Sequence, residues 1–479
     1  MFRRASLLAL ACSLAGCPGP VAPSDAGLDA APSPDAGPDA PTVTPTDAGS
    51  DAGAALPPII RPEPHTVPAS EAGHDRYLAV AFDSDSSFYV AGVAADGTDA
   101  GADFRVIVRH FGADGELDAD FGEAGLFERN LVAGTNGEIV RSIAVDSEGR
   151  IVVVGTVEAE GAADTRDRDA FALRVLPSGV IDPAFADGGV AILDFSEGVV
   201  SGTSFVADAG FGLAIDEADR AIVHGAEVRA GGEDLDWVVA RLTEAGELDP
   251  TFAGDGTFSL DIGSASANAR HIERFGGRIL ASGYTTLSGG VIQPVVFALT
   301  DAGELDPAFG DGGIFTEVVL PAQTEVYDVA RVGDALVTCG YGRADGPGDN
   351  DFLSLRLDAS GALDRTYGED GVALLTGFDF GDNARELVAL PDGRTLHVGA
   401  LRTSASEADA ALVMFGPDGT IDTTFDGDGV QLVNTAPGTV DHFWSVAVDP
   451  LGLRVVAVGI GGTDPATDDD GLLYLFDLR

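Results

Sequence analysis

A unit of about sixty residues recurs along most of this chain, and this repetition limits the folds open to it. GELDPTFAGDG at residues 246–256 returns almost unchanged as GELDPAFGDGG at residues 303–313. The motif behind both copies, Leu/Ile-Asp-x-x-Phe/Tyr-x-x-x-Gly, occurs six times in the 479 residues, with its aromatic residue at Phe121, Phe185, Phe252, Phe309, Tyr367 and Phe425. A short apolar run ending in glycine occurs seven times, with that glycine at Gly92, Gly155, Gly225, Gly283, Gly340, Gly399 and Gly459. Such a period indicates a solenoid, a propeller or a similar array.

Each unit reads as four short strands separated by turns rich in Asp, Gly and Pro. In the second unit, IAVDSEGR at 143–150 supplies a strand and a turn, IVVVG at 151–155 the next strand, and FALRVL at 171–176 a third. β-Branched residues dominate these runs, and no segment keeps a helical period. The paired turns and the length of the unit favour a propeller over a solenoid. The sequence therefore predicts an all-β fold, a seven-bladed β-propeller of four-stranded antiparallel blades preceded by a disordered linker.

Two stretches of the repeat resemble a known family. IVVVG…DAFALRVLPSGVIDPAFADGGVAI and ILASG…PVVFALTDAGELDPAFGDGGIF are similar to the bacterial delta-60 repeat of secreted and surface proteins. The resemblance extends over nearly everything from residue 76 to residue 479. It implies a β-propeller-like repeat fold, and it carries no chemistry because the family has no defined activity.

The expected organisation is a signal peptide at 1–16, a tether at 17–58 and the propeller at 59–479. The first three strands of a unit occur seven times but the fourth only six, because the last unit stops at GLLYLFDLR. An open sheet edge invites aggregation, so we expect residues 60–68 to supply the missing strand. Their prolines suit only an outer edge strand. The repeats are expected at 76–132, 138–197, 210–264, 269–320, 326–377, 384–435 and 442–479.

The N terminus has the form of an export signal. In MFRRASLLALACSLAGC, two arginines precede an apolar run that is too short to span a bilayer. The run ends in LAGC at 14–17, which resembles the bacterial lipoprotein lipobox and implies that Cys17 carries the lipid. Cys12 fits that pattern less well, and an ordinary signal peptide with a chance cysteine is the alternative. We expect an exported protein, lipid-anchored to the outer membrane or cell surface of a Gram-negative bacterium.

Composition limits the partners. Residues 18–58 consist mainly of Pro, Ala, Asp, Gly, Ser and Thr, which cannot bury a core, so a disordered tether is expected. The chain carries 27 basic and 78 acidic residues and a formal net charge of −51, which argues against nucleic acid and against adsorption to anionic lipid. Contact with the membrane is expected only through the lipid anchor, and the protein is expected to be a monomer.

The repeated residues have structural explanations. The aromatic residue of the motif is expected to be a wedge between blades, and the motif aspartate to cap the following turn. Those aspartates are Asp118, Asp182, Asp249, Asp306, Asp364 and Asp422. Arg174, Arg241 and Arg356 share one position in the third strand and could pair with such an aspartate, although Ala298 and Met414 occupy that position elsewhere.

Motifs for chemistry are scarce. The seven histidines are scattered, and His224 and Cys339 occupy a core-facing position of the second strand. DGDG at 426–429 could hold calcium, but turn chemistry explains it better. No Gly-x-Ser-x-Gly elbow occurs, and GFGLA at 210–214 matches a dinucleotide loop poorly. The sequence predicts no catalytic residue, no cofactor (calcium being the one possibility left open) and Cys17 as the site of lipid attachment.

One face of the predicted propeller varies between units. The loops between second and third strands share no motif, as at 157–169, 343–351 and 461–470, and the link at 196–210 is long. Such loops are where binding residues usually lie, although they could equally be acidic spacers. The favoured function is a non-enzymatic binding or scaffold module for a protein or glycan partner on this face. The alternatives are a calcium-dependent propeller hydrolase or lactonase with its site in the central channel, and a structural surface-layer component.

Overall fold

A computed structural model describes residues 56–69, 73–95, 103–132, 138–158, 168–196, 199–201, 204–206, 208–228, 235–263, 266–287, 289–344, 350–376, 381–404, 407–463 and 469–478. The predicted signal peptide, Cys17 and most of the predicted tether lie outside these residues. Within them every regular element is a strand, so the all-β prediction is confirmed. None of the described segments forms a helix long and apolar enough to cross a membrane.

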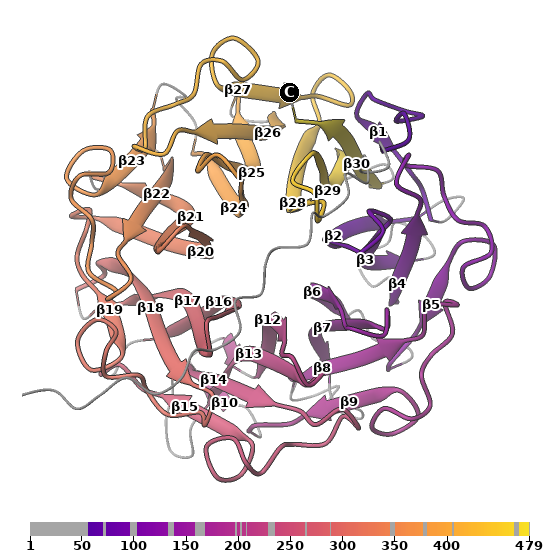
Figure 1. The fold of residues 1–479 in the computed structure, drawn as a ribbon, viewed down its shortest axis with the longest axis horizontal. Coiled ribbons are helices and arrows are strands. Elements are labelled where there is room, and N and C mark those ends of the chain that lie inside the picture. Colours follow the sequence, from indigo (N-terminus) through magenta and orange to yellow (C-terminus); the bar gives the residue numbers. More distant parts are fainter. Residues whose placement is uncertain are drawn as a thin grey trace, which may run out of the picture. The chain divides into compact units, whose positions relative to one another are not determined.

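The strands form antiparallel sheets that follow one another around a ring (Figure 1). Three four-stranded sheets consist of β2 (Asp75–Phe82), β3 (Phe88–Ala95), β4 (Phe104–Phe111) and β5 (Phe127–Arg129); of β6 (Ile139–Val145), β7 (Ile151–Glu158), β8 (Arg168–Val175) and β9 (Val190–Leu193); and of β12 (Ala209–Ile215), β13 (Ala221–Val228), β14 (Leu235–Arg241) and β15 (Thr257–Leu260). In each sheet the strand that comes first in the sequence lies innermost (Figure 1). The long link after β9 contains a small hairpin of β10 (Val199–Ser201) and β11 (Ser204–Val206), which the sequence did not predict.

Two larger sheets each contain two sets of strands in the same order. The first has β16 (Ala267–Phe275), β17 (Arg278–Thr286), β18 (Ile292–Thr300) and β19 (Ile314–Thr316), then β20 (Gln323–Val332), β21 (Ala335–Arg343), β22 (Asp351–Leu357) and β23 (Val372–Leu375). The second has β24 (Asn383–Ala389), β25 (Thr395–Arg402), β26 (Ala408–Phe415) and β27 (Val430–Val433), then β28 (Val440–Val448), β29 (Arg454–Thr463) and β30 (Asp470–Asp477), with β1 (His65–Thr66) at its edge. In each large sheet a single parallel residue pair joins the two sets, Ile292 with Gln323 and Ala408 with Val440.

The two ends of the unit Leu56–Arg479 meet in one sheet. β1 pairs antiparallel with β30 through His65 opposite Leu473, inside the range expected for a closing strand. Arg454 reinforces this junction: its guanidinium pairs with Asp477 at 2.7 Å and donates to the carbonyl oxygens of Pro57 and Ala113. The last strands of the chain are thereby tied to its first described residues.

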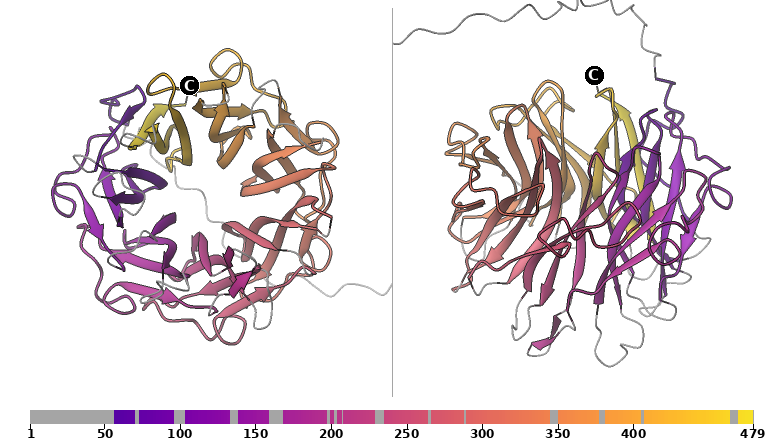
Figure 2. Two further views of the ribbon diagram at one scale, coloured as in Figure 1. Left: turned by 180° about the vertical axis from the view of Figure 1, so that it is seen from behind. Right: turned by 60° about the horizontal axis from the view of Figure 1, so that its bottom comes forward.

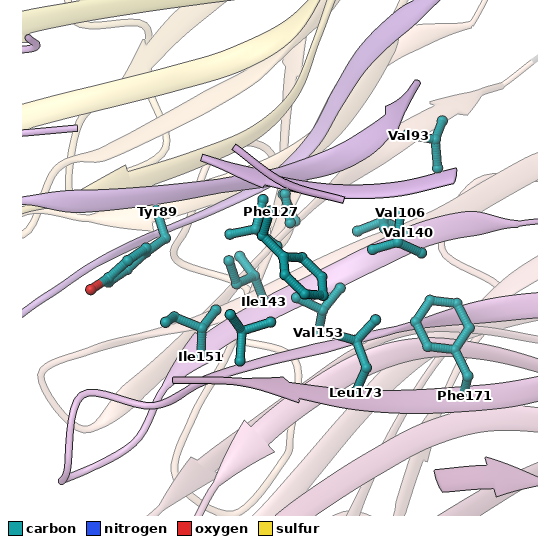
Figure 3. Packing of buried hydrophobic residues seen from close by; sticks show 14 of the residues in the cluster. Tyr89, Val93, Val106, Phe127, Val140, Ile143, Ile151, Val153, Phe171 and Leu173 are labelled. Atoms are coloured by element: carbon teal, nitrogen blue, oxygen red, sulfur yellow. The ribbon is translucent and has the colours of Figure 1, made fainter. Parts of the chain in front are cut away.

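The core lies between neighbouring sheets, which stand side by side around the ring with their connections at its two ends (Figure 2). Figure 3 shows one such interface, where Phe127 and Val106 of the first sheet pack against Ile143, Val153 and Leu173 of the second. The middle strands are buried on both faces and consist mainly of apolar residues. The inner strands alternate, because one face is covered by a neighbouring sheet while the other turns toward the centre.

The motif aromatics are wedges, as predicted, at five of their six positions. Phe121, Phe185, Phe252, Phe309 and Tyr367 are at most 1% exposed. The turn of the following sheet covers the ring: a Cβ on Gly303 would lie 2.9 Å from the ring of Phe252. The N–H of Ala253 donates to the carbonyl of Ala302 in the same turn at 2.7 Å. Phe425 is the exception, because its ring is only partly buried.

The predicted roles of the motif aspartate are confirmed. Asp182 accepts the N–H of Ala184 at 3.0 Å, which caps the turn. The expected arginine pairs form at 2.8 Å for Arg174–Asp182, 2.8 Å for Arg241–Asp249 and 2.7 Å for Arg356–Asp364. Where the third strand has Ala298 or Met414 instead, an arginine from the second-strand side takes over, in the pairs Arg278–Asp306 at 2.7 Å and Arg394–Asp422 at 3.0 Å. This exchange of the arginine between strands was not predicted from the sequence.

Candidate functional site

Every innermost strand has a β-bulge in its first half. The pairing with the second strand slips by a residue, for example between Tyr77 and Ala79 and between Val140 and Ser142. A bulge of this kind re-aims a side chain. The residues at the equivalent bulge positions are Leu78, Arg141, Phe211, Arg270, Tyr327, Arg385 and Trp444.

The repeated glycine of the second strand makes room for the bulge. A Cβ on Gly92 would lie 1.8 Å from the carbonyl oxygen of Arg76, two residues before the bulged Leu78. The other glycines face the corresponding carbonyls, with Cβ to oxygen distances of at most 2.3 Å: Gly155 and Ile139, Gly225 and Ala209, Gly283 and Asn268, Gly340 and Glu325, Gly399 and Asn383, Gly459 and His442. Any other residue would place a Cβ against this carbonyl oxygen. The glycine of the second strand is therefore required for the bulge that turns the side chain inward.

The bulged side chains line a cavity of about 460 Å³ at the centre of the ring. Asn268, His271, Asp328 and Glu386 contribute to the same lining. The start of β2 pairs with the end of β3, through Asp75 opposite Ala94. The bulges therefore lie toward the end of the ring where second and third strands connect, which is the face with the variable loops.

Arginines and aromatic rings alternate around much of this lining. Arg141 and Arg270 both lie over Phe211, at 5.4 and 5.2 Å from the ring centroid. Arg270 and Arg385 both lie over Tyr327, at 4.6 and 4.7 Å, and Arg385 also lies 4.6 Å from Trp444. Cation–π contacts of this kind hold a guanidinium in place without an anion. We call the set Arg141, Phe211, Arg270, Tyr327, Arg385 and Trp444 the arginine–aromatic ladder.

The ladder contains polar donors without acceptors. Arg270 donates to the backbone oxygen of Ala269 and the hydroxyl of Tyr284, both at 2.8 Å. Among the described residues, the Nε atoms of Arg141, Arg270 and Arg385 and the indole nitrogen of Trp444 are buried without a hydrogen-bond partner. Burial, followed by the charges of Arg270 and Arg385, lowers the pKa of Arg141 to about 10. The arrangement concentrates positive charge inside a strongly acidic molecule.

A second cluster, His271 with Asp328 and Glu386, adjoins the ladder. Ligand atoms of these residues lie within 4.8 Å of one another, and His271 Nδ1 is 3.2 Å from Asp328. Burial first, and then Asp328, raises the pKa of Glu386 to about 8. Both carboxylates also hold the backbone, because Asp328 accepts the N–H of Leu387 at 2.8 Å and Glu386 accepts the N–H of Val446 at 2.9 Å. Each therefore joins its strand to the next inner strand.

Several residues considered in the sequence have a structural place. His224 and Cys339 are fully buried, as predicted for core positions, and burial lowers the pKa of His224 to about 3. Asp428 of the DGDG stretch caps a turn by accepting the N–H of Val430 at 3.0 Å. Most of the variable loops lie outside the described residues, namely 159–167, 345–349, 464–468 and parts of 196–210.

Neither the arginine–aromatic ladder nor the His271 cluster was predicted from the sequence. Their members differ in type from repeat to repeat and come from strands far apart in the chain, so no local motif marks them. The usable signal was the repeated glycine, since a glycine inside a strand commonly marks a bulge on its neighbour.

Residues 390–425 match the family model of a domain of unknown function, DUF5122, described as a β-propeller. This chain is a β-propeller repeat protein. No curated protein matches it. Among solved structures it is similar to a protein of unknown function from Dyadobacter fermentans, at 14% identity over 87% of this chain and 98% of that chain, with a TM-score of 0.42. It is also similar to the polysaccharide lyase Uly1, at 12% identity over 84% of this chain and 90% of that chain, with a TM-score of 0.47. A third similar structure is the β-propeller domain of the Trilobed protease from Pyrococcus furiosus, at 9% identity over 84% of this chain and 98% of that chain, with a TM-score of 0.41. At such values these likenesses carry no argument about function.

Proposed function

We propose that this protein is a non-enzymatic binding module, tethered to the cell surface, that takes a glycan or protein partner at the variable-loop end of its propeller. The observation that supports the proposal is the convergence of bulged side chains, one from each inner strand, on a single cavity. Small-ligand sites combine aromatic surface with a few oriented polar groups, and the arginine–aromatic ladder has both. Its rings and guanidinium groups are positioned by their contacts with one another.

We propose seven blades for the ring, closed by residues 60–68, and membership of the delta-60 repeat family. The pairing of β1 with β30 and the contacts of Arg454 support the closure. A further support is that the two larger sheets each divide at a single residue pair.

We propose attachment through lipid on Cys17, with export to the outer membrane or cell surface and a flexible tether over 17–58. The lipobox-like LAGC and the Pro- and Asp-rich stretch after it support this placement. The net charge of −51 disfavours binding to nucleic acid and direct adsorption to anionic lipid, so the lipid anchor is the expected contact with the membrane. Repulsion between copies of so acidic a chain also favours a monomer.

The test is an array of glycans and peptides probed with the full-length chain and two variants. Tyr327→Ala removes the ring shared by Arg270 and Arg385, and Phe476→Ala removes an aromatic residue of the third strand of its sheet as the control. We expect a defined set of ligands for the wild type, weakened at least about tenfold by Tyr327→Ala only. An array without signal, or calcium-dependent turnover of ester or lactone substrates, contradicts the proposal.

The second candidate is the calcium-dependent hydrolase or lactonase. It is favoured by one observation, the approach of His271, Asp328 and Glu386 in the channel. Against it, both carboxylates are engaged by backbone N–H groups of the next strand. Thermal unfolding in chelator, millimolar calcium and millimolar magnesium decides the matter, since an ion that binds the native state stabilises it by mass action. A saturable, calcium-specific rise that Asp328→Asn abolishes would favour the enzyme.

A further inference from the structure

We propose that the channel binds the carboxylate of an acidic sugar between Arg141, Arg270 and Arg385. The inference rests on the proposed binding function and names its ligand class. The three guanidinium groups come from β6, β16 and β24, which are separated in the chain and meet only at the centre of the ring (Figure 1).

The three guanidinium groups are oriented by the ring faces of the ladder over which they lie. The two terminal nitrogens of Arg270 donate to Ala269 and to the hydroxyls of Tyr284 and Tyr327, which leaves its Nε–H. Among the described residues no hydrogen bond engages Arg141 or Arg385, so their N–H edges remain to bind a ligand. A planar guanidinium edge matches the two oxygens of a carboxylate. Side chains held by aromatic rings lose less rotational freedom on binding than free arginines, which favours affinity.

The ladder has a surplus of hydrogen-bond donors. Arg141, Arg270, Arg385 and Trp444 each have a buried nitrogen without an acceptor among the described residues. Buried donors of this kind are rare in native proteins, and a bound acceptor would satisfy them. An apolar or cationic ligand would leave all of them unpaired.

The ladder also carries positive charge that no described carboxylate pairs with directly. No ion pair joins Arg141, Arg270 or Arg385 to a carboxylate of the described residues, although Glu325 acts on Arg270 at longer range. Asp328 and Glu325 accept hydrogen bonds from a backbone N–H and from the Gln323 side chain instead. The positive charge of the ladder is therefore left for a ligand.

The cavity lining beside the arginines is suited to the hydroxyl groups of a sugar. Ser142, Asn268, His271 and Asp328 line the same cavity and offer both donors and acceptors, which suits hydroxyl groups. The cavity of about 460 Å³ has the size of a small-molecule site. An acidic sugar meets both requirements, whereas the side chain of an acidic peptide brings few hydroxyls.

The test is calorimetric titration of the full-length chain with sodium glucuronate, glucose, sodium sulfate and N-acetylaspartate. We expect glucuronate to bind at least tenfold more tightly than glucose, sulfate or N-acetylaspartate. Arg270→Met and Arg385→Met should each weaken glucuronate binding about tenfold or more, since a hydrogen bond to a charged group is lost. Arg365→Met is the matched control, because Arg365 is exposed and pairs with Glu317 and Asp370 outside the channel.

A measurement without variants guards against misfolding. Of the two tryptophans, Trp444 belongs to the ladder and Trp237 lies in the core, so glucuronate should change the intrinsic fluorescence of the wild type. Each other outcome overturns the inference. If glucose binds as tightly as glucuronate, the proposed recognition of a carboxylate is refuted, while the proposed binding function stands. Tighter binding of N-acetylaspartate indicates an acidic peptide, and tighter binding of sulfate an inorganic anion. No binding of any probe refutes the channel site, while the array still tests the binding module by itself.

Discussion

The wedge at Phe252 yields the most quantitative prediction. Phe252 is fully buried, the turn at Gly303 covers its ring, and Arg241 lies 4.9 Å from the ring centroid. Phe252→Ala should lower the free energy of unfolding by about 3–5 kcal/mol, the usual cost of such a cavity. The lost cation–π contact places the expected value in the upper half of that range. The pairing of Arg241 with Asp249 at 2.8 Å should survive, because Arg241 also donates to the carbonyl of Asp301 and to the hydroxyl of Thr251.

Phe425 supplies a control within the same chain. It occupies the same position of the motif, but it is only partly buried, and among the described arginines none stacks on it. Phe425→Ala should therefore cost less than Phe252→Ala, about 1–2 kcal/mol, since the ring is partly exposed and buries less apolar surface.

Urea unfolding of the wild type and both variants, followed by near-ultraviolet and far-ultraviolet circular dichroism, measures the two costs. Coincident transitions with an unchanged m-value are needed to compare free energies. Equal losses for Phe252→Ala and Phe425→Ala would refute the reasoning, because they would mean that the covering turn contributes nothing to the wedge.

Two further expectations come from the structure and one from the sequence of the N terminus. Gly283→Ala places a Cβ about 2.1 Å from the oxygen of Asn268, so it should cost about 1–3 kcal/mol and weaken ligand binding at Arg270, as urea unfolding and titration would show. Glu386 has a pKa raised to about 8 from 4.5, so the native chain holds a proton that the unfolded chain releases. This contribution is complete below pH 4.5 and is lost as the pH rises through about 8, and Glu386→Gln should flatten the decline in melting temperature between these values. Cys17→Ser should move the protein from the detergent phase to the aqueous phase on Triton X-114 partitioning.

Much of the propeller scaffold could be predicted from the sequence, because the same residues make the same structural contacts in each repeat. The motif aspartate, its turn and the buried aromatic ring are local or join adjacent sheets, so the same residues return at a constant spacing. The arginine was less predictable. Asp306 and Asp422 each need a cation, but it can come from the third strand or from the second, as Arg278 and Arg394 show.

The candidate site could not be predicted for the opposite reason. Inward residues have no shared partner within their own repeat, so Leu78, Arg141 and Phe211 bear no resemblance to one another. Their proximity depends on the closure of the ring, which brings together strands some sixty or more residues apart. A glycine such as Gly340 indicates where a side chain turns inward, and it says nothing about which side chain that is.

The pairing of glycine with bulge separates two kinds of evolutionary change. The glycine makes the space that the bulge needs, so the bulged residue does not have to fit between the strands of its own sheet. Its side chain can therefore be exchanged while the strand keeps its structure. A lineage of such proteins can therefore acquire a new ligand by recoding single positions, one in each repeat, while the architecture that presents them is inherited intact.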